Sequence, residues 1–141
     1  MNKFYLLALC LFVLFVSENV NAQLVDDTSK VIIKRVAKSN PEGYNISDIY
    51  LKKDKKINVY EIRVDLDVPL STKLSLAVKD TSEDVLMYLI NDIVIPKGTY
   101  RVRWEMPLCK ETKDCDGYLA GRYLCVFETD QFIYQKDFFL K

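Results

Sequence analysis

Few side chains in this sequence have the chemistry for acid–base or nucleophilic catalysis, and histidine is absent. The chain therefore lacks the commonest general base, the commonest zinc ligand and the Ser-His-acid arrangement of many hydrolases. A carboxylate pair of the glycosidase type would have to come from four residues in strand-like segments, namely Glu61, Asp65, Asp67 and Glu105. Because these carboxylates alternate with apolar residues, we interpret them as the solvated face of a sheet and predict that the protein is not an enzyme.

Cysteine supplies the other reactive groups. Cys109 and Cys115 are separated by five residues, which is long enough for a chain reversal and short enough for the pair to meet readily. We predict a disulfide between them, while the two pairings that involve Cys125 stay open. An unpaired Cys125 is interpreted as a buried small hydrophobe, with an intermolecular bridge as the alternative. The acidic residues near the pair lack a calcium-loop pattern, so we predict no metal site and no cofactor.

Alternation of apolar and polar residues predicts the strands that would position these groups. Residues 60–67 alternate apolar and charged side chains, and the same period returns at 73–79 and at 100–106. A period of two with one polar face indicates half-buried strands of antiparallel sheets. Weaker patterns predict further strands at residues 31–37, 46–51, 85–95, 118–129 and 132–140.

About eight strands with short connections predict an all-β fold, a sandwich of two antiparallel sheets, rather than an α/β fold. Residues 82–93 have a helical alternative, because Ser82-Glu83-Asp84 is typical of a helix start, but we favour the strand. Aromatic residues concentrate in the last third of the chain. They either close the core or line an apolar cavity, and periodicity does not separate these two roles.

The N-terminal residues predict export. Residues 1–22 combine Lys3, an apolar run and the small-residue ending Val20-Asn21-Ala22, which is typical of a cleavable signal peptide. The apolar run is shorter than the roughly 20 residues that cross a bilayer, so we expect no stable membrane insertion. Residues 23–141 would then form a single secreted, extracellular domain, with Asn45 of the sequon Asn45-Ile46-Ser47 as the predicted glycosylation site. Balanced charge, with 20 basic and 20 acidic residues, argues against a nucleic-acid partner.

Three segments resemble the ML lipid-recognition family, which includes ganglioside-activator-like and insect chemosensory relatives. They are Val68-Pro69-Leu70, the turn and strand at residues 95–106, and Tyr123-Leu124-Cys125-Val126-Phe127-Glu128. The resemblance covers about residues 46–127 and implies an immunoglobulin-like sandwich that holds a lipid tail, sterol or other apolar molecule between its sheets. It also implies which side chains face that interior and contact the ligand, namely Tyr60, Ile62, Val64, Leu66, Tyr100, Val102, Trp104 and Phe127.

The chain departs from this family at two places. Family members usually carry a cysteine near the mature N-terminus that bonds the late-strand cysteine, whereas residues 23–108 contain no cysteine, so Cys125 lacks that partner. Residues 107–121 are also longer than the usual hairpin and carry their own cysteine pair.

Two hypotheses for the function follow. The first is a secreted, non-enzymatic carrier that holds a small apolar ligand, such as a lipid, sterol or semiochemical, between two sheets. The alternative is an extracellular protein-interaction module with a packed core, which binds a protein partner through its surface and the Cys109 to Cys115 loop. They differ in whether the space between the sheets accepts a ligand.

Overall fold

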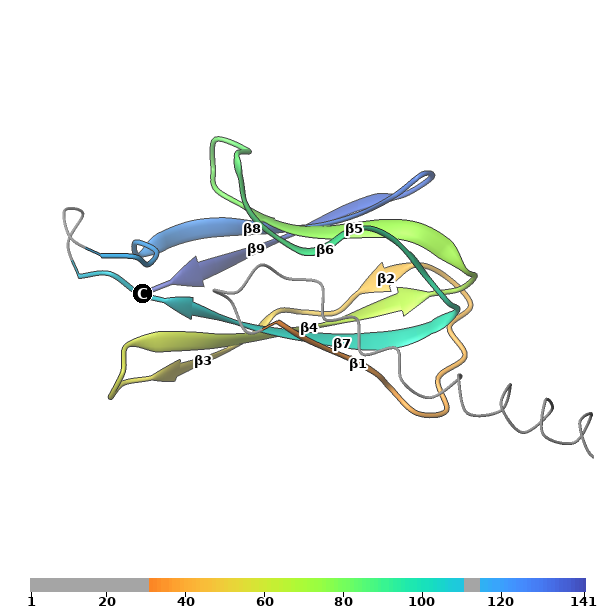
Figure 1. Cartoon of the computed structure of the whole chain (residues 1–141), viewed down its shortest axis with the longest axis horizontal. Helices are drawn as coiled ribbons and strands as arrows, with labels where there is room; N and C mark the ends of the chain where they lie inside the picture. Colours follow the sequence, from red (N-terminus) through yellow and green to blue (C-terminus); the bar gives the residue numbers. More distant parts are fainter. Residues whose placement is uncertain (1–30, 111–114) are drawn as a thin grey trace, which may run out of the picture.

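The computed structural model describes residues 31–110 and 115–141, so the predicted signal peptide and part of the Cys109 to Cys115 loop lie outside the described residues. Two antiparallel sheets pack face to face as a β-sandwich (Figure 1). The fold class predicted from the alternating segments is therefore confirmed. The described part of the chain contains nine strands and no helix, where about eight strands were expected.

The first sheet, sheet A, is built around two long strands. β4 (Val59–Val68) and β7 (Gly98–Pro107) pair without interruption from one end to the other. β1 (Ile32–Arg35) extends the sheet beyond β7. On the other side of β4 lie two short strands, β2 (Asn45–Ile46) and β3 (Tyr50–Asp54).

The extra strand arises where one strand was predicted over residues 46–51. Ser47 interrupts that segment: its N–H donates to the carbonyl of Asp65 at 2.9 Å, and its Oγ accepts the Asp65 N–H at 2.8 Å. The serine side chain thus takes the place of a backbone acceptor, as serine often does at strand ends and turns. The ladder along β4 resumes only at Tyr50, which pairs with Arg63.

The second sheet, sheet B, has the strand order β6-β5-β8-β9. It consists of β5 (Thr72–Lys79), β6 (Val85–Ile95), β8 (Gly121–Thr129) and β9 (Ile133–Leu140). Residues 85–95 form the strand β6, interrupted by bulges against β5, so the strand prediction is confirmed over the helical alternative. The predicted strand over residues 118–129 begins only at Gly121, because Tyr118 instead forms an isolated bridge with Leu108.

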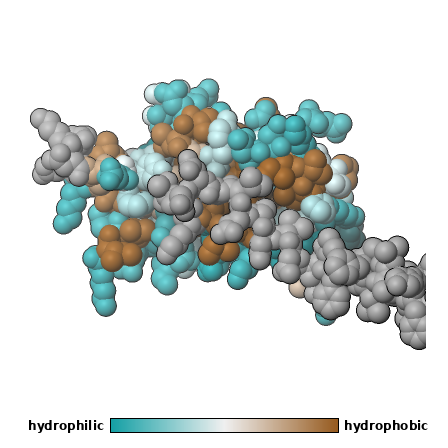
Figure 2. Space-filling view, in the orientation of Figure 1, coloured by the Kyte–Doolittle hydropathy of each residue, from teal (hydrophilic) through white to brown (hydrophobic). Residues whose placement is uncertain are grey.

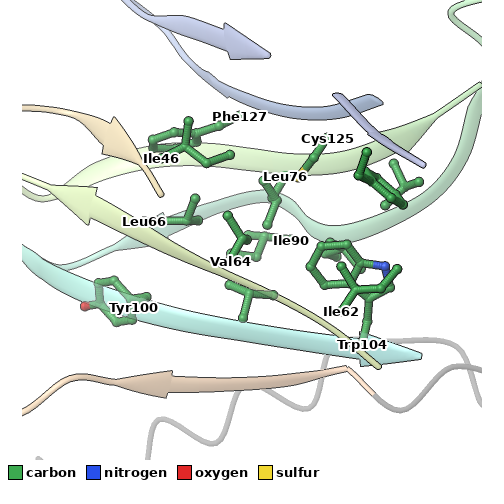
Figure 3. Close-up of a cluster of buried hydrophobic side chains, with 14 of the residues drawn as sticks. Ile46, Ile62, Val64, Leu66, Leu76, Ile90, Tyr100, Trp104, Cys125 and Phe127 are labelled. Carbon is green, nitrogen blue, oxygen red and sulfur yellow. The ribbon is translucent and has the colours of Figure 1, made fainter. Parts of the chain in front are cut away.

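The core lies between the sheets and follows the predicted alternation. Every even-numbered residue of β4 from Tyr60 to Val68 is buried, and the odd-numbered ones are partly exposed. In the close-up of the core, Val64 and Trp104 of sheet A face Leu76 and Phe127 of sheet B (Figure 3). Burial of each such large apolar side chain stabilises the fold by about 1.5–3 kcal/mol.

The two outward faces differ. Sheet A carries charged residues outward, whereas sheet B carries three apolar side chains there, Ala77, Leu124 and Val126, that are at most 7 % exposed. Apolar residues on β6 also reach the surface, with Tyr88 45 % and Val94 61 % exposed. Figure 2, in the orientation of Figure 1, shows hydrophobic residues in several separate groups among hydrophilic ones.

Candidate functional site

The structure gathers all eight predicted ligand-lining residues in the interior. β4 supplies Tyr60, Ile62, Val64 and Leu66; β7 supplies Tyr100, Val102 and Trp104; β8 supplies Phe127. Each is at most 8 % exposed. Because several have no exposed surface at all, side chains fill the space around them. Binding of a ligand at these residues therefore requires the sheets to separate, and their role in binding stays a prediction.

One end of the interior holds an aromatic cluster around Trp104. Its ring meets Phe138 edge-on at a centroid distance of 6.3 Å, and Phe138 stacks on Tyr123 at 5.7 Å. Tyr118 approaches Tyr123 edge-on at 6.3 Å. Sequence periodicity placed Trp104 on the inward face but gave no sign that β9 would supply its partner, because that contact joins residues far apart in the chain.

A second aromatic cluster lies at the opposite end of β8. Tyr44 stacks on Phe132 at 5.3 Å, and Phe132 meets Phe127 edge-on at 5.8 Å. Tyr44 was not among the predicted site residues, since it precedes β2 in a segment without periodicity. The interior is thus bounded by rings at both ends.

The polar side-chain atoms of the interior differ in whether they have a hydrogen-bond partner. The hydroxyl of Tyr60 donates to the carbonyl of Lys141 at 2.7 Å, that of Tyr100 to Pro96 at 2.8 Å, and that of Tyr123 to Leu119 at 2.6 Å. Trp104 Nε1, by contrast, is buried without a hydrogen-bond partner. Such an unsatisfied donor is rare in native structures.

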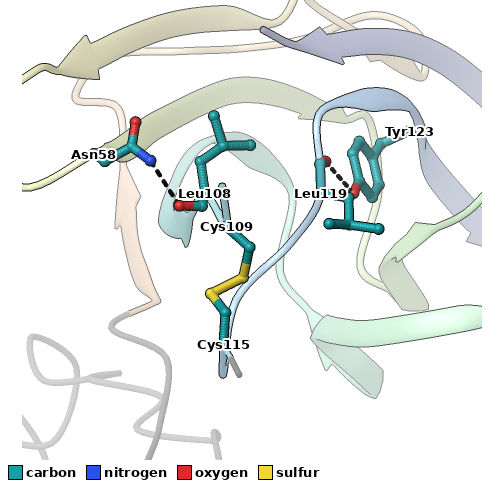
Figure 4. The surroundings of a disulfide bond; sticks show 6 residues. All are labelled: Asn58, Leu108, Cys109, Cys115, Leu119 and Tyr123. Atoms are coloured by element: carbon teal, nitrogen blue, oxygen red, sulfur yellow. Dashed lines mark hydrogen bonds between the residues drawn. A yellow bond between two sulfur atoms is a disulfide. The ribbon is translucent and has the colours of Figure 1, made fainter. Parts of the chain in front are cut away.

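The Cys109 to Cys115 disulfide is confirmed (Figure 4), and the Cys109 N–H donates to the carbonyl of Tyr118 at 2.7 Å. Next to it, Asn58 Nδ2 donates to the carbonyl of Leu108 at 2.7 Å. Gly117 passes so close that a Cβ there would lie 2.6 Å from the carbonyl oxygen of Pro107 and 2.9 Å from the Cys109 sulfur. The connection from β7 to β8 is therefore fixed at its base. Lys113 of the predicted binding loop lies outside the described residues.

Cys125 is a free thiol with no exposed surface, as the interpretation of a buried small hydrophobe predicted. Its side chain projects into the interior near Leu76 (Figure 3). Burial raises the pKa of the thiol to about 12. Because the thiolate is the reactive form, the thiol is inert in the folded protein at neutral pH.

The four candidate carboxylates lie on the outward face of sheet A. Arg101 donates two hydrogen bonds of 2.9 Å to Asp65, and these hold the pKa of that carboxyl below its usual range. Glu61 pairs with Arg103 at 3.3 Å. Asp67 accepts a hydrogen bond of 2.6 Å from Thr99, and Glu105 is exposed. Within the described residues, no three acidic, cysteine or histidine side chains are grouped to hold a metal ion.

Asn45, the predicted glycosylation site, is exposed at the start of β2. Its neighbour Ile46 is 1 % exposed and packs into the core. The asparagine side chain is thus accessible for modification at the sheet edge, although its glycosylation stays a prediction.

A hollow of about 840 Å³ opens at one end of sheet B, between the β5–β6 pair and the β8–β9 turn. Tyr88 and Ile133 line it with their exposed apolar surface. Its remaining lining is mostly polar and includes Lys73, Asp92, Glu128 and Asp130. Sequence reasoning missed this hollow, because the β8–β9 turn and the β6 bulge that line it are far apart in the chain and come together only through the pairing of the strands.

The chain matches no protein-family model, no curated protein and no solved structure. The resemblance to the ML lipid-recognition family therefore stays a prediction. Across residues 31–110 and 115–141, no helix is long and apolar enough to span a membrane.

Proposed function

We propose that the protein is a secreted, non-enzymatic carrier that takes up a small apolar ligand between its two sheets. The observation that carries this proposal is an asymmetry of sheet B: its strand β6 is irregularly paired, whereas β9 is regularly paired and bonded to sheet A. If the edge strand β6 separates from sheet A more easily than β9 does, the sandwich can open along β6 and admit a ligand there.

The interior favours an apolar ligand. Among the described residues, Thr129 is the only buried residue that is polar or charged. The side chains that face inward from both sheets are otherwise aliphatic or aromatic. Transfer of an apolar molecule from water into such a space is favourable by about 25 cal/mol per Å² buried, before ordering costs are subtracted.

β6 is the wall that yields in this proposal. Its register with β5 shifts at three points, between Leu74 and Leu76, between Leu76 and Ala77, and between Val78 and Lys79. At one of these bulges Asp92 adopts a left-handed φ of 54°, and its N–H donates to the Ser75 side chain at 2.9 Å. Interrupted ladders at a sheet edge open at lower free energy than continuous ones.

The opposite side of sheet B is anchored. Tyr60 of β4 donates to the carbonyl of Lys141 and accepts its N–H at 3.0 Å. Lys53 of β3 donates to the same carbonyl at 2.6 Å, and Lys136 of β9 pairs with Asp48 at 2.7 Å. These links hold the end of β9 to sheet A, so separation of the sheets is expected along β6.

Analysis of the secreted protein tests the carrier function. The full chain, expressed in eukaryotic secretory cells, should show a bound apolar compound by native mass spectrometry and by solvent extraction. Ile93→Ala alters an inward, partly buried residue of β6 and should lower retention of that compound. The adjacent Val94→Ala alters an outward residue that is 61 % exposed and serves as the matched control. Protein that is consistently empty and takes up no added lipid would overturn the proposal.

The hollow on sheet B favours a second candidate, an extracellular module that binds a protein partner. Tyr88 is 45 % and Ile133 68 % exposed at its rim, and exposed aromatic and aliphatic residues are typical of interaction sites. In this case Tyr88→Ala should abolish cross-linking to the partner in the extracellular fluid, whereas Ile93→Ala should not. The carrier hypothesis expects the reverse pattern for ligand retention.

A further inference from the structure

We propose that the ligand is a neutral lipid that bears an oxygen atom, and that this oxygen accepts a hydrogen bond from Trp104 Nε1. The inference rests on the proposed carrier function and specifies its ligand class. It starts from a buried polar atom without a partner, at a residue that is 1 % exposed and whose indole lies between the sheets (Figure 3).

Within the described residues, no group of the protein accepts a hydrogen bond from the indole of Trp104. The indole N–H is only a donor, so it needs an oxygen or another acceptor. The hydroxyls of Tyr60, Tyr100 and Tyr123 each donate to a backbone carbonyl, and none of them accepts a hydrogen bond from the indole. Phe138, which the Trp104 ring meets edge-on, has no acceptor atom.

A bound water is a poor solution for this donor. An ordered interior water usually makes about three hydrogen bonds to otherwise unsatisfied polar groups. Trp104 Nε1 and Arg103 Nε are the unpartnered buried side-chain atoms in the described residues. Arg103 projects from the outward face of β7, because it alternates with Trp104 along that strand. A water at the indole would thus have one unsatisfied side-chain partner.

The charge of the interior restricts the acceptor further. The described residues place no cationic side chain among the buried ones, and an unpaired carboxylate is strongly disfavoured in apolar surroundings. The acceptor is therefore a hydroxyl, ester or ketone oxygen rather than an ionised acid. Pure hydrocarbons are disfavoured as well, because they leave the indole unpaired.

The position of Trp104 gives the ligand an orientation. Trp104 is paired with Ile62 near one end of β4, and Val68 lies at the other end. Six residues of extended strand span about 20 Å. The oxygen lies at the Trp104 end, beside the aromatic cluster, and the apolar tail runs along β4 toward Leu66 and Phe127.

Trp104 is the single tryptophan of the chain, so its indole gives one unambiguous NMR signal. The full secreted chain, labelled with ¹⁵N-tryptophan and stripped of lipid, is titrated with four probes of equal chain length: hexadecane, hexadecanol, methyl hexadecanoate and ionised hexadecanoic acid. We expect hexadecanol and the methyl ester to shift the indole proton downfield. We also expect them to bind about tenfold or more tightly than hexadecane, which leaves the indole N–H unpaired. The same preference is expected over the ionised acid, whose carboxylate is disfavoured in the apolar interior.

Two variants separate a specific hydrogen bond from packing. Trp104→Phe should keep hexadecane binding but lose the tenfold preference for the alcohol. Tyr123→Phe removes a hydroxyl that already has a backbone partner and should keep that preference. If Trp104→Phe does not fold, the indole shift of the unaltered protein decides alone.

The possible outcomes are distinct. Equal binding of hexadecane and hexadecanol to the unaltered protein, with no indole shift, overturns this inference and leaves the carrier function standing. Preference for the ionised acid also overturns it. Failure of all four probes to bind removes the carrier function and this inference with it.

Discussion

The two outer strand pairs of sheet B differ in the regularity of their pairing. β8 and β9 keep one register over eight consecutive residue pairs, from Gly121 with Leu140 to Glu128 with Ile133. β5 and β6 change register three times over a pairing of similar length. Lys141, directly after β9, accepts hydrogen bonds from Tyr60 and Lys53 of sheet A, whereas Pro96, directly after β6, accepts a single one, from Tyr100. The same sheet thus has a fixed side and a yielding side.

The proposed carrier function requires a packed sandwich to admit a ligand without a permanent cavity, and this difference suggests where it would open. Residues such as Ile62 and Phe127 have no exposed surface, so the closed form leaves no room beside them. The interior is accessible only while a wall moves, and sub-global openings of this kind start from the least stable elements. Because its pairing is the irregular one, we propose β6 as that element.

Size-matched truncations on the two sides should break the comparison most strongly. Leu140→Ala on β9 removes a side chain that is 2 % exposed and should lower the free energy of unfolding by about 2–5 kcal/mol. Ile93→Ala on β6 removes a partly buried one and should cost about 1–2 kcal/mol. Urea denaturation with a common m-value measures both. An equal cost would mean that the two sides are equally well packed.

Amide hydrogen exchange compares the two strand pairs directly. Amides bonded between β5 and β6 should exchange about 5–30-fold faster than those bonded between β8 and β9, because an opening that is easier by about 1–2 kcal/mol changes the open population by that factor. Mass spectrometry of peptides from both hairpins resolves the two rates. Bound ligand should slow β6 more than β9. Uniform protection across sheet B would contradict a yielding β6.

The central strands were readable from the sequence because their burial is strictly one-sided. Tyr60 to Asp67 alternate without exception, so the strand, its inward face and the charged outward face were all predicted. The short spacing of Cys109 and Cys115 likewise sufficed for the disulfide. In each case the determining interactions are local or periodic.

Features that depend on long-range contacts were not predictable. The split of residues 46–51 depends on Ser47 meeting Asp65 across the sheet. The apolar outward residues of sheet B, such as Leu124 and Val126, give a continuous apolar run in which periodicity assigns no face. That Trp104 lacks a hydrogen-bond partner follows from what surrounds it in three dimensions. Sequence alone supplied only its inward direction.

The buried thiol offers a kinetic view of the same opening. Iodoacetamide reacts with thiolates, and Cys125, with its pKa raised to about 12, should react at neutral pH only after the interior opens. Ile93→Ala should raise the alkylation rate about fivefold, if its loss of about 1 kcal/mol falls on that opening. The outward Val94→Ala should leave the rate unchanged. Rapid labelling of the unaltered protein would show that Cys125 is accessible without opening.

The smallest effect is expected from the exposed ion pair of Lys136 and Asp48, which links β9 to the connection between β2 and β3 at 2.7 Å. The hydrogen bond from Lys136 lowers the pKa of Asp48, so the pair stabilises the fold above the ordinary pKa of the carboxyl and loses that contribution as the pH falls through the lowered value. Asp48→Asn should therefore be slightly destabilising at neutral pH, less so in high salt, and neutral in strong acid.

The ion pair of Lys73 and Asp92 is the matched control, since it joins β5 to β6 within one sheet at the same distance of 2.7 Å. A double-mutant cycle for each pair, followed by urea denaturation, gives the two coupling energies. The rate of Cys125 alkylation then measures whether either ion pair restrains the opening of the interior. Because Tyr60 still holds Lys141 when Asp48 is changed, Asp48→Asn should raise the labelling rate far less than Ile93→Ala does. An equal rise would mean that the sheets separate at β9 as readily as at β6.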